Sequence, residues 1–348
     1  MKARLGDVCT VVSGSTPKST VPEYWDGDIK WITPAELSND TYIINDSARH
    51  ITALGVAKTG LKSFPAGTVI LSSRAPIGKT AIAGCEMFCN QGFKNLICSE
   101  KIDSKYLYYF LSGKTDYLNS LGRGATFKEI SKAIVENIEI PLPEVEEQKR
   151  IAARFERLLR LIQLQKAELE ELDKLVKSRF IELFGDPIDN TMGLKTMPLG
   201  EACFLKAGIT TTADAIHEQS AVYPVPCYGG NGIRGYVKEA TQHGCYPIIG
   251  RQGALCGNVQ MATGEFHATE HAVLVTPLIE TNVVWLFHLL RMMDLYRFHT
   301  GAAQPGLAVK TLNTVDIPIA EIAVQNNFAS FVEQADKSKL CGRMEVAA

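Results

Sequence analysis

The longest regular pattern of apolar positions lies between residues 144 and 184. It alternates in steps of four and three, through positions 151, 155, 158, 162, 165, 169, 172, 176, 179 and 183, of which only 165 and 179 are polar. This period of 3.5 residues predicts a helix with a coiled-coil seam, which needs a second helix to cover it. Pro143 suits the start of the helix and Gly185-Asp186-Pro187 its end, so it would be about 60 Å long.

A repeated phrase supplies the second helix. The sequence "NIEIPLPEVEEQKRIA" at residues 137–152 returns as "TVDIPIAEIAVQNNFA" at 314–329, with Gln148 matching Gln325. Farther upstream, "LGDVCTVVSGST" (5–16) matches "LGEACFLKAGIT" (199–210). In between, "ILSSRAPIGKTAI" corresponds to "IIGRQGALCGNVQ", with Arg74 on Arg251, and "NQGFKNLI" corresponds to "ATEHAVLV". The first copy has about 17 more residues, which we expect in or around "PEYWDGDIKWITPAEL".

The repeat predicts an α+β protein with two similar globular domains separated by long antiparallel coiled-coil helices. We expect a first domain at 1–143, a central helix at 144–190, a second domain at 191–320 and a shortened second helix at 321–348. The second seam stops early, because "KLCGRMEVAA" contains a glycine and does not continue it. Three explanations stay open: a functional shortened rod, a seam completed by another polypeptide or a second copy, and an inactive truncated protein.

Composition narrows the class of protein only a little. The chain of 348 residues is 46% hydrophobic and 21% charged, which is ordinary for a globular protein, and no apolar run is long enough to span a membrane. Nine cysteines without a C-x-x-C pair, and no secretory leader, favour reduced thiols in the cytoplasm. The net charge of −2 means that a nucleic-acid partner would have to be recognised by local groups.

Three short patterns resemble catalytic motifs, and each lacks the context that its chemistry needs. "SRAPIGKT" (73–80) has Ser73 where a phosphate-binding loop has its first glycine, and no helix pattern follows. "GNGIRG" (230–235) is expected to be a turn between strands rather than a dinucleotide site. "HATEH" (267–271) precedes a strand-like alternation, whereas the zinc motif of this form requires a helix. We therefore expect neither catalytic residues nor a bound metal or cofactor.

Polar, glycine-bearing loops occupy matching places in both halves. Arg, Lys, Ser and Thr can donate to phosphates, while Arg, Asn, Gln and His can read base edges, so these loops are candidates for DNA binding. Solvated turns are the plainer interpretation for any single residue. The candidates are Ser15, Thr16, Lys18, Arg74, Lys79, Gln91, Lys94, Arg123, Lys128, Thr210, Thr211, Arg234, Arg251, Asn258, His271 and Gln304.

These motifs together resemble the specificity subunit of a type I restriction-modification system. The resemblance rests on "GSTP", "WITPAEL", "ILSSRAPIGKTAI", "NQGFKNL", "LGRGATFKEISKAIVENIEIPLPEVEEQKRIA" and "DIPIAEIAVQNNFASFVEQADKSK", and it spans about residues 1–340. It implies two target recognition domains, each reading half of a bipartite double-stranded DNA site, and helices that set the spacer.

The same resemblance implies the partners. The helices would dock modification (methyltransferase) subunits, which a restriction (endonuclease and translocase) subunit would join, and a second copy of the chain is a further candidate. S-adenosylmethionine and ATP would belong to those partners, so this chain would bind no cofactor. A DNA-independent coiled-coil scaffold is the alternative from another class of function, and DNA retention at low and high salt would distinguish the two.

Overall fold

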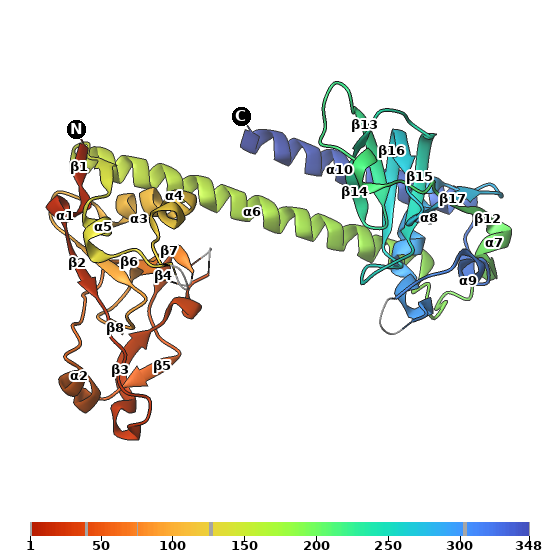
Figure 1. Ribbon diagram of the computed structural model, residues 1–348. Coiled ribbons are helices and arrows are strands. Elements are labelled where there is room, and N and C mark those ends of the chain that lie inside the picture. Colours follow the sequence, from red (N-terminus) through yellow and green to blue (C-terminus); the bar gives the residue numbers. More distant parts are fainter. Residues whose placement is uncertain (1, 39–40, 75, 125–127, 302–304, 348) are drawn as a thin grey trace. The chain divides into compact units, whose positions relative to one another are not determined.

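The computed structural model describes residues 2–38, 41–74, 76–124, 128–301 and 305–347, the last eight of these as backbone only. The chain forms two compact units; the first ends at Leu161 and the second begins at Ile162 (Figure 1). Each unit contains mixed sheets and short helices, and helix α6 (Val145–Phe184) contributes residues to both. Among the described residues, none of the helices combines the length and hydrophobicity that a membrane span requires.

The first unit is built on a five-stranded sheet in the order β2-β9-β6-β7-β4. A smaller sheet, β5-β3-β8, and the pair β1-β10 complete it. Its elements are β1 Lys2–Arg4, α1 Leu5–Val8, β2 Cys9–Ser13, η1 Pro22–Tyr24, β3 Trp25–Ile32, η2 Pro34–Glu36, β4 Ile43–Ile44, β5 Arg49–Ile51, α2 Ala53–Thr59, β6 Val69–Ser73, β7 Ile77–Ala83, β8 Phe88–Cys89, β9 Lys94–Cys98, α3 Ser104–Ser112, α4 Thr115–Leu121, α5 Lys132–Glu136 and β10 Glu139–Pro141.

Strand β6 shows why this sheet lies at the centre of the unit. Val69 and Leu71 belong to a core cluster with helices α3 and α4, whereas Ile70 belongs to a second cluster on the other face. Successive side chains of a strand point to opposite faces, so a continuously apolar strand is expected where both faces are covered. All three side chains are fully buried.

The second unit repeats this plan around a six-stranded sheet in the order β12-β17-β15-β16-β13-β14, with β11-β18 as a separate pair. Its elements are β11 Lys195–Pro198, α7 Leu199–Ala202, β12 Cys203–Ala207, η3 Ala213–Ala215, β13 Val225–Gly229, β14 Gly232–Val237, β15 Gln242–Gly250, β16 Val259–Ala268, β17 Ala272–Pro277, α8 Val283–Met292, η4 Leu295–Phe298, α9 Val309–Asn313, β18 Asp316–Ile319 and α10 Ile322–Ala347.

Two buried glutamines show how closely the repeat is kept. The Gln148 amide accepts a hydrogen bond of 2.9 Å from the backbone N–H at the N-cap of α3 and donates one of 2.8 Å to Pro143 O. Gln325 makes the same bonds to the N-cap of α8 and to Ala320 O, at 2.9 and 2.8 Å. Each amide therefore ties the start of a long helix to its own domain. The predicted repeat is confirmed.

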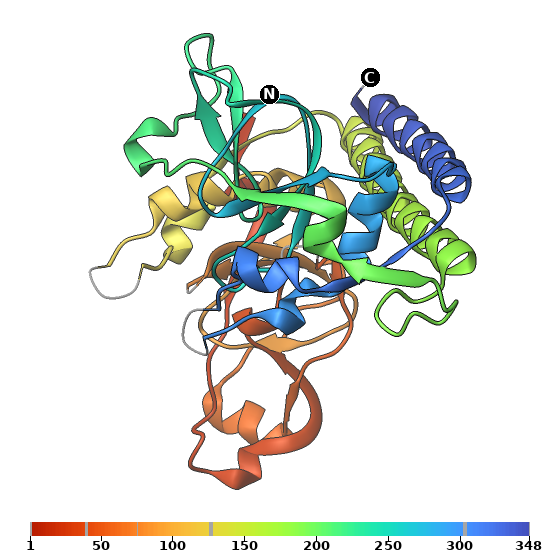
Figure 2. The ribbon, with the colours of Figure 1, turned by 90° about the vertical axis from the view of Figure 1, so that its right-hand side faces the viewer.

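Helix α6 has 40 residues and α10 has 26. Within the second unit they pack against each other, as Figure 2 shows. The Phe328 ring lies 5.4 Å from Phe180 and, farther along α10, Lys339 Nζ lies 2.7 Å from an Asp173 carboxylate oxygen. Later residues of α10 thus meet earlier residues of α6, which confirms the predicted antiparallel pair.

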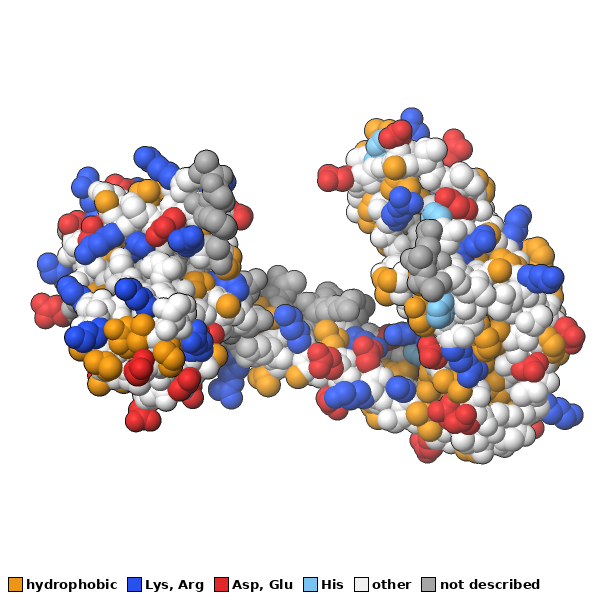
Figure 3. Space-filling view, turned by 60° about the horizontal axis from the view of Figure 1, so that its bottom comes forward, with side chains coloured by type: hydrophobic (Ala, Val, Ile, Leu, Met, Phe, Trp, Pro, Cys, Tyr) orange, Lys and Arg blue, Asp and Glu red, His pale blue; other side chains and the backbone are white. Residues whose placement is uncertain are grey.

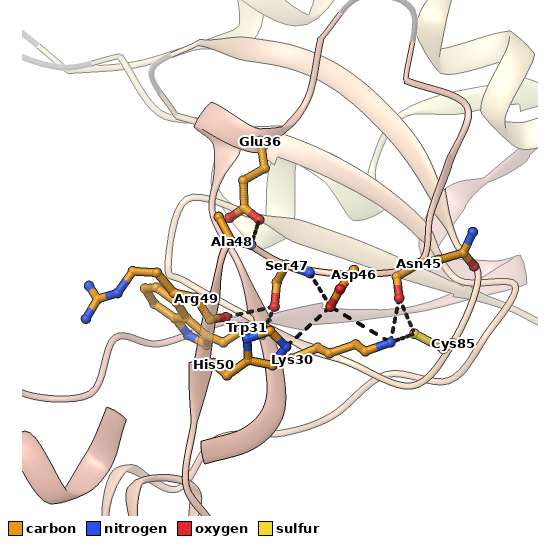
Figure 4. Close-up of polar contacts among 10 residues, drawn as sticks. All are labelled: Lys30, Trp31, Glu36, Asn45, Asp46, Ser47, Ala48, Arg49, His50 and Cys85. Atoms are coloured by element: carbon orange, nitrogen blue, oxygen red, sulfur yellow. Dashed lines mark hydrogen bonds and ion pairs between the residues drawn. The ribbon is translucent and has the colours of Figure 1, made fainter. Parts of the chain in front are cut away.

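In the first unit a long connection, residues 33–48, joins β3 to β5. The equivalent strands of the second unit, β13 and β14, are joined by a tight turn. Figure 4 shows how side chains anchor the long connection. The Glu36 carboxylate accepts a hydrogen bond of 2.7 Å from the backbone N–H of the last residue of this connection, and Ser47 Oγ accepts one of 3.0 Å from a backbone N–H of β3. Lys30 Nζ lies 4.0 Å from the Asp46 carboxylate. The expected extra residues therefore overlap residues 22–37 but extend beyond them.

Candidate nucleic-acid interface

Four loops of the first unit meet at one edge of its main sheet. Strand β9 lies between β2 and β6 and is antiparallel to both. The loops that follow Ser13 and Ser73 therefore lie beside the loop that precedes Lys94. A fourth segment joins them, because Arg123 and Glu129 exchange backbone hydrogen bonds of 3.0 and 2.9 Å and the next N–H donates to Ser73 O at 2.9 Å.

The second unit brings the matching loops together in the same way. Strand β17 lies between β12 and β15, so the loops after Ala207 and Gly250 lie beside the loop before Ala272. Thr300 and Gly306 exchange backbone hydrogen bonds of 2.8 and 2.9 Å, as Arg123 and Glu129 do in the first unit. Both units therefore present the polar loops identified in the sequence along one sheet edge.

A glycine allows two of these loops to approach each other closely. A Cβ atom on Gly14 would lie 2.2 Å from Cys89 O, and one on Gly208 would lie 2.1 Å from Ala268 O. Both distances are far below contact, so a side chain at either place would push the loops apart. In each unit the next backbone N–H donates to that same carbonyl oxygen, at 3.0 and 2.9 Å.

The backbone hydrogen bonds correct the predicted match of Arg74 with Arg251. Ser73 O accepts a bond of 2.9 Å from Ile130 N, and Arg251 O accepts the equivalent bond of 2.8 Å from Leu307 N. Ser73 is therefore the counterpart of Arg251, and Arg74 corresponds to the residue that follows it. The ungapped alignment of these two stretches already has this register, and the pairing of the two arginines is wrong by one residue.

The candidates in the first unit differ in exposure. Exposed to solvent are Thr16, Lys18, Gln91, Arg123 and Lys128, and half-buried are Ser15, Arg74 and Lys79. The Lys79 ammonium donates to Leu37 O, and Thr16 Oγ1 donates to Gln91 Oε1.

Lys94 does not have the position expected of a DNA contact. Its side chain is only 8% exposed, and its ammonium lies 3.1 Å from a Glu129 carboxylate oxygen and 3.3 Å from Ser73 Oγ. A buried ammonium needs such partners, because an unpaired buried charge is strongly destabilising. Lys94 therefore holds the fourth loop against the sheet, a structural role that differs from the predicted contact with DNA.

Two of the candidates in the second unit, Arg234 and His271, line a hollow of about 450 Å³. Exposed are Thr210 and Arg234, and half-buried are Thr211, Arg251, Asn258 and His271. Arg234 and His271 line the hollow together with Gln252 and the turn at Gly229, Gly230 and Asn231. Asn258 reaches its rim, since its amide donates to Asn231 Oδ1. Gln304 lies outside the described residues.

Glu270 belongs to this edge, although sequence reasoning missed it. One carboxylate oxygen accepts the backbone N–H of Thr211 at 3.1 Å, and the other lies 3.2 Å from His271 Nε2. Burial alone would raise the pKa of Glu270. Backbone hydrogen bonds from its own N–H and from that of Thr211, together with the charges of His271 and Arg234, outweigh this effect and lower the pKa. The sequence gives no signal for Glu270, because carboxylates are not expected among groups that meet phosphates.

His267 lies just behind this edge and is structural. Its ring is buried, with Nε2 2.8 Å from Thr211 Oγ1 and Nδ1 3.2 Å from Thr241 Oγ1. Burial lowers the pKa of His267, so the neutral ring is favoured. Its two threonine partners connect the loop after β12 to the start of β15.

Charge on these surfaces is mixed. On the face drawn in Figure 3, Lys and Arg side chains of each unit are interspersed with Asp and Glu side chains. This agrees with the net charge of −2. DNA recognition by such a surface would depend on individually placed donors and acceptors more than on a broad positive field.

The three motif-like stretches have the structures expected of them. Residues 77–83 form strand β7, residues 230 and 231 are the turn between β13 and β14, and residues 267–271 run from β16 to the start of β17. Within the described part of the chain, no group of three or more His, Cys, Asp or Glu side chains is arranged to hold a metal ion.

Comparisons with known proteins point to one family. A family model described as the type I restriction modification DNA specificity domain matches residues 1–174 and 193–341. The EcoprrI specificity subunit of Escherichia coli is 31% identical over 349 residues, which cover 95% of this chain and 86% of that protein. The MjaIX specificity subunit of Methanocaldococcus jannaschii is 36% identical over 239 residues, covering 64% of this chain and 55% of that protein.

Two solved structures from type I restriction-modification systems share this fold. The crystal structure of a type I restriction-modification S subunit from M. genitalium matches with a TM-score of 0.62 at 17% identity, covering 100% of this chain and 92% of that one. A chain from a structural study of complex assembly and conformational transition in the type I system matches with a TM-score of 0.62 at 19% identity, covering 100% and 93%. The predicted fold class is thereby confirmed.

Proposed function

We propose that this chain, which belongs to the family of type I restriction-modification DNA specificity proteins, recognises a bipartite DNA site with one sheet edge from each of its two similar units. The main support is that the same four loops converge in both units, held by equivalent backbone hydrogen bonds, while their side chains differ. Two edges with one frame and different chemistry suit two half-sites with different sequences.

We assign the two recognition domains to residues 1–143 and 191–320. In the first, the proposed contacts are the exposed Thr16, Lys18, Arg123 and Lys128, with Ser15, Arg74 and Lys79 beside them and Gln91 holding Thr16 in place. In the second they are Thr210 and Arg234, with Thr211, Arg251, Asn258 and His271 beside them. Long cationic side chains would reach phosphates or guanine edges, and the amides and hydroxyls would read or orient bases.

The helices at 144–190 and 321–348 would carry the partners. Helix α6 exposes large apolar side chains that a surface helix normally buries, with Leu158, Leu159 and Leu161 in the first unit and Leu164 and Leu175 in the second each more than 40% exposed. We propose that modification subunits dock on these leucines and that a restriction subunit joins through them. A second copy of the chain is the other candidate occupant.

The chain would then be the recognition component of the complex, without catalytic groups or a cofactor of its own. Two linked domains that bind together convert two weak half-site affinities into one strong one, provided that the spacing of the half-sites fits. Half-site spacing is therefore part of the recognised signal, and we propose that α6 sets it.

The test is selection from random DNA. The full chain, purified with its modification subunits, is incubated with random duplexes, and the retained DNA is sequenced after repeated rounds at moderate salt. We expect two short conserved blocks separated by a fixed number of variable base pairs. A retained pool without any common sequence, or one continuous block, would contradict a bipartite reader, and a lack of DNA retention even at low salt would favour a protein scaffold.

A further inference from the structure

One side chain in each unit joins two of the four loops. In the first unit, Gln91 Oε1 accepts a hydrogen bond from Thr16 Oγ1, which connects the loop before β9 to the loop after β2. In the second, a Glu270 oxygen accepts the Thr211 N–H at 3.1 Å, which connects the loop before β17 to the loop after β12. The other Glu270 oxygen lies 3.2 Å from His271 Nε2.

The register of the two sheets makes these side chains equivalent. Ser13 pairs with Lys94 in the first unit, and Ala207 pairs with Val273 in the second. Gln91 and Glu270 each stand three residues before that paired position. The direct alignment of "NQGFKNLI" with "ATEHAVLV" is shifted by one residue and hides this equivalence.

Gln91 and Glu270 share a role, as oxygen acceptors for the opposite loop, but differ in residue type. Both side chains offer an oxygen acceptor to the opposite loop, but one is a neutral amide that meets a hydroxyl and the other is a carboxylate that meets a backbone N–H. The Glu270 side chain is 29% exposed, so a carboxylate there loses part of its hydration and needs the hydrogen bonds that it makes. A merely solvated surface residue would not need them.

We propose that Gln91 and Glu270 are equivalent positioning residues, each of which fixes the two loops with which its own domain reads one half-site. The inference rests on the proposed function of DNA recognition. Discrimination between bases requires donors and acceptors that are held within about half an ångström of their productive places. Without the joining side chain, the two loops are still held by a backbone hydrogen bond, but their ends are less ordered, and this ordering cost is incurred on binding to every sequence.

The two acceptors differ in charge, and this supplies a conservative substitution. Glu270→Gln keeps an oxygen that can accept the Thr211 N–H, as the glutamine of the first unit accepts from Thr16. Glu270→Ala removes the acceptor. The exposed Glu265 on β16 supplies a matched control, since Glu265→Ala removes the same charge a few residues away.

The experiment is a DNA selection carried out with the full chain and its modification subunits in five forms: wild type, Glu270→Ala, Glu270→Gln, Glu265→Ala and Gln91→Ala. The probe is a pool of random duplexes, followed by titration of the selected duplex and its single-base variants. We expect Glu270→Ala to lower discrimination in one half-site by about tenfold or more. Gln91→Ala should do the same in the other half-site, whereas Glu270→Gln and Glu265→Ala should keep the wild-type letters.

Each result decides the proposal. If Glu270→Ala and Gln91→Ala leave both half-sites unchanged, or change the same one, the two side chains are not equivalent positioning residues. If Glu270→Gln loses discrimination as Glu270→Ala does, the charge matters and not the connection between loops, and the proposal is overturned. Should Glu270→Ala fail to fold, the glutamine variant and Gln91→Ala still decide. If the wild type selects no sequence, the proposed function itself fails.

Discussion

A seven-residue insertion in α6 tests whether this helix determines the spacing of the half-sites. We place it between Leu159 and Arg160, where both flanking side chains are exposed and lie well before Asp173, the residue that meets Lys339 of α10. The insertion should therefore leave the packing of each unit intact. Seven helical residues add about 10 Å along the axis, and one base pair adds about 3.4 Å, so the preferred spacer should become about three base pairs longer.

The affinity for this longer site should be lower than that of the wild type for its own site. Two helical turns and seven residues differ by only about 20°, so the insertion nearly preserves the facing of α6. Three extra base pairs rotate DNA by about 100°, because a turn contains about 10.5 base pairs. Either DNA or protein must twist to bring both half-sites into contact, and twisting costs free energy.

The assay is DNA selection followed by titration, with the wild type and a four-residue insertion at the same place for comparison. The shorter insertion adds about 6 Å, or about two base pairs, and turns the helix by about 40°. Both variants should retain the letters of each half-site, because the loops are unchanged. An altered letter, or an unchanged spacer in both variants, would refute the idea that α6 sets the spacing.

Three further predictions concern single residues. Arg123→Ala and Arg234→Ala should each weaken DNA binding by about 1–3 kcal/mol and relax a different half-site; unchanged affinity and salt dependence in titrations would exclude them as contacts. Lys94→Met should lower the free energy of unfolding, measured in urea, by roughly 1–3 kcal/mol, because the ion pair with Glu129 is lost. The salt dependence of DNA binding should stay the same; a weaker salt dependence would show that Lys94 contacts a phosphate. Burial lowers the pKa of His288 to about 4, so the unfolded chain takes up a proton at a higher pH than the folded one does. The free energy of unfolding should therefore fall by up to roughly 3 kcal/mol as the pH drops from 6.5 to 4. Urea unfolding of His288→Leu should show a shallower decline than the wild type, and an equal decline would contradict His288 as its cause.

The parts of the fold that depend on local sequence were the ones predicted well. The seam of α6 repeats every 3.5 residues, so its helix was evident from 144 to 184, and the observed bounds are Val145–Phe184. Each copy of the repeated phrase contains a glutamine, Gln148 or Gln325, which makes equivalent hydrogen bonds in its own unit. Such signals need no knowledge of how distant strands pair.

The composition of the sheet edge could be predicted, but its register and its buried charges could not. The partner of Lys94 is Glu129, 35 residues away, so only the folded chain reveals that this lysine is buried and paired. The alignment of Gln91 with Glu270 depends on which residues of β9 and β17 face their neighbours. A shift of one residue reverses the face of every side chain in a strand, and no local pattern in these loops fixes it.

The way in which the two units differ supports the proposal that one frame serves two sequences. Gly14 and Gly208 keep their residue type, because a Cβ there would collide with the opposite backbone. The buried lysine next to them is not repeated. Lys94 lies beside Ser73 in the first unit, whereas in the second unit Val273 stands at the position of Lys94 and Arg251 at that of Ser73. The first unit thus has a buried lysine in β9, and the second has a half-buried arginine directly after β15. If the two edges read DNA as proposed, the side chains there could be replaced without refolding the domain, and a change of recognised sequence would require no change in the helices.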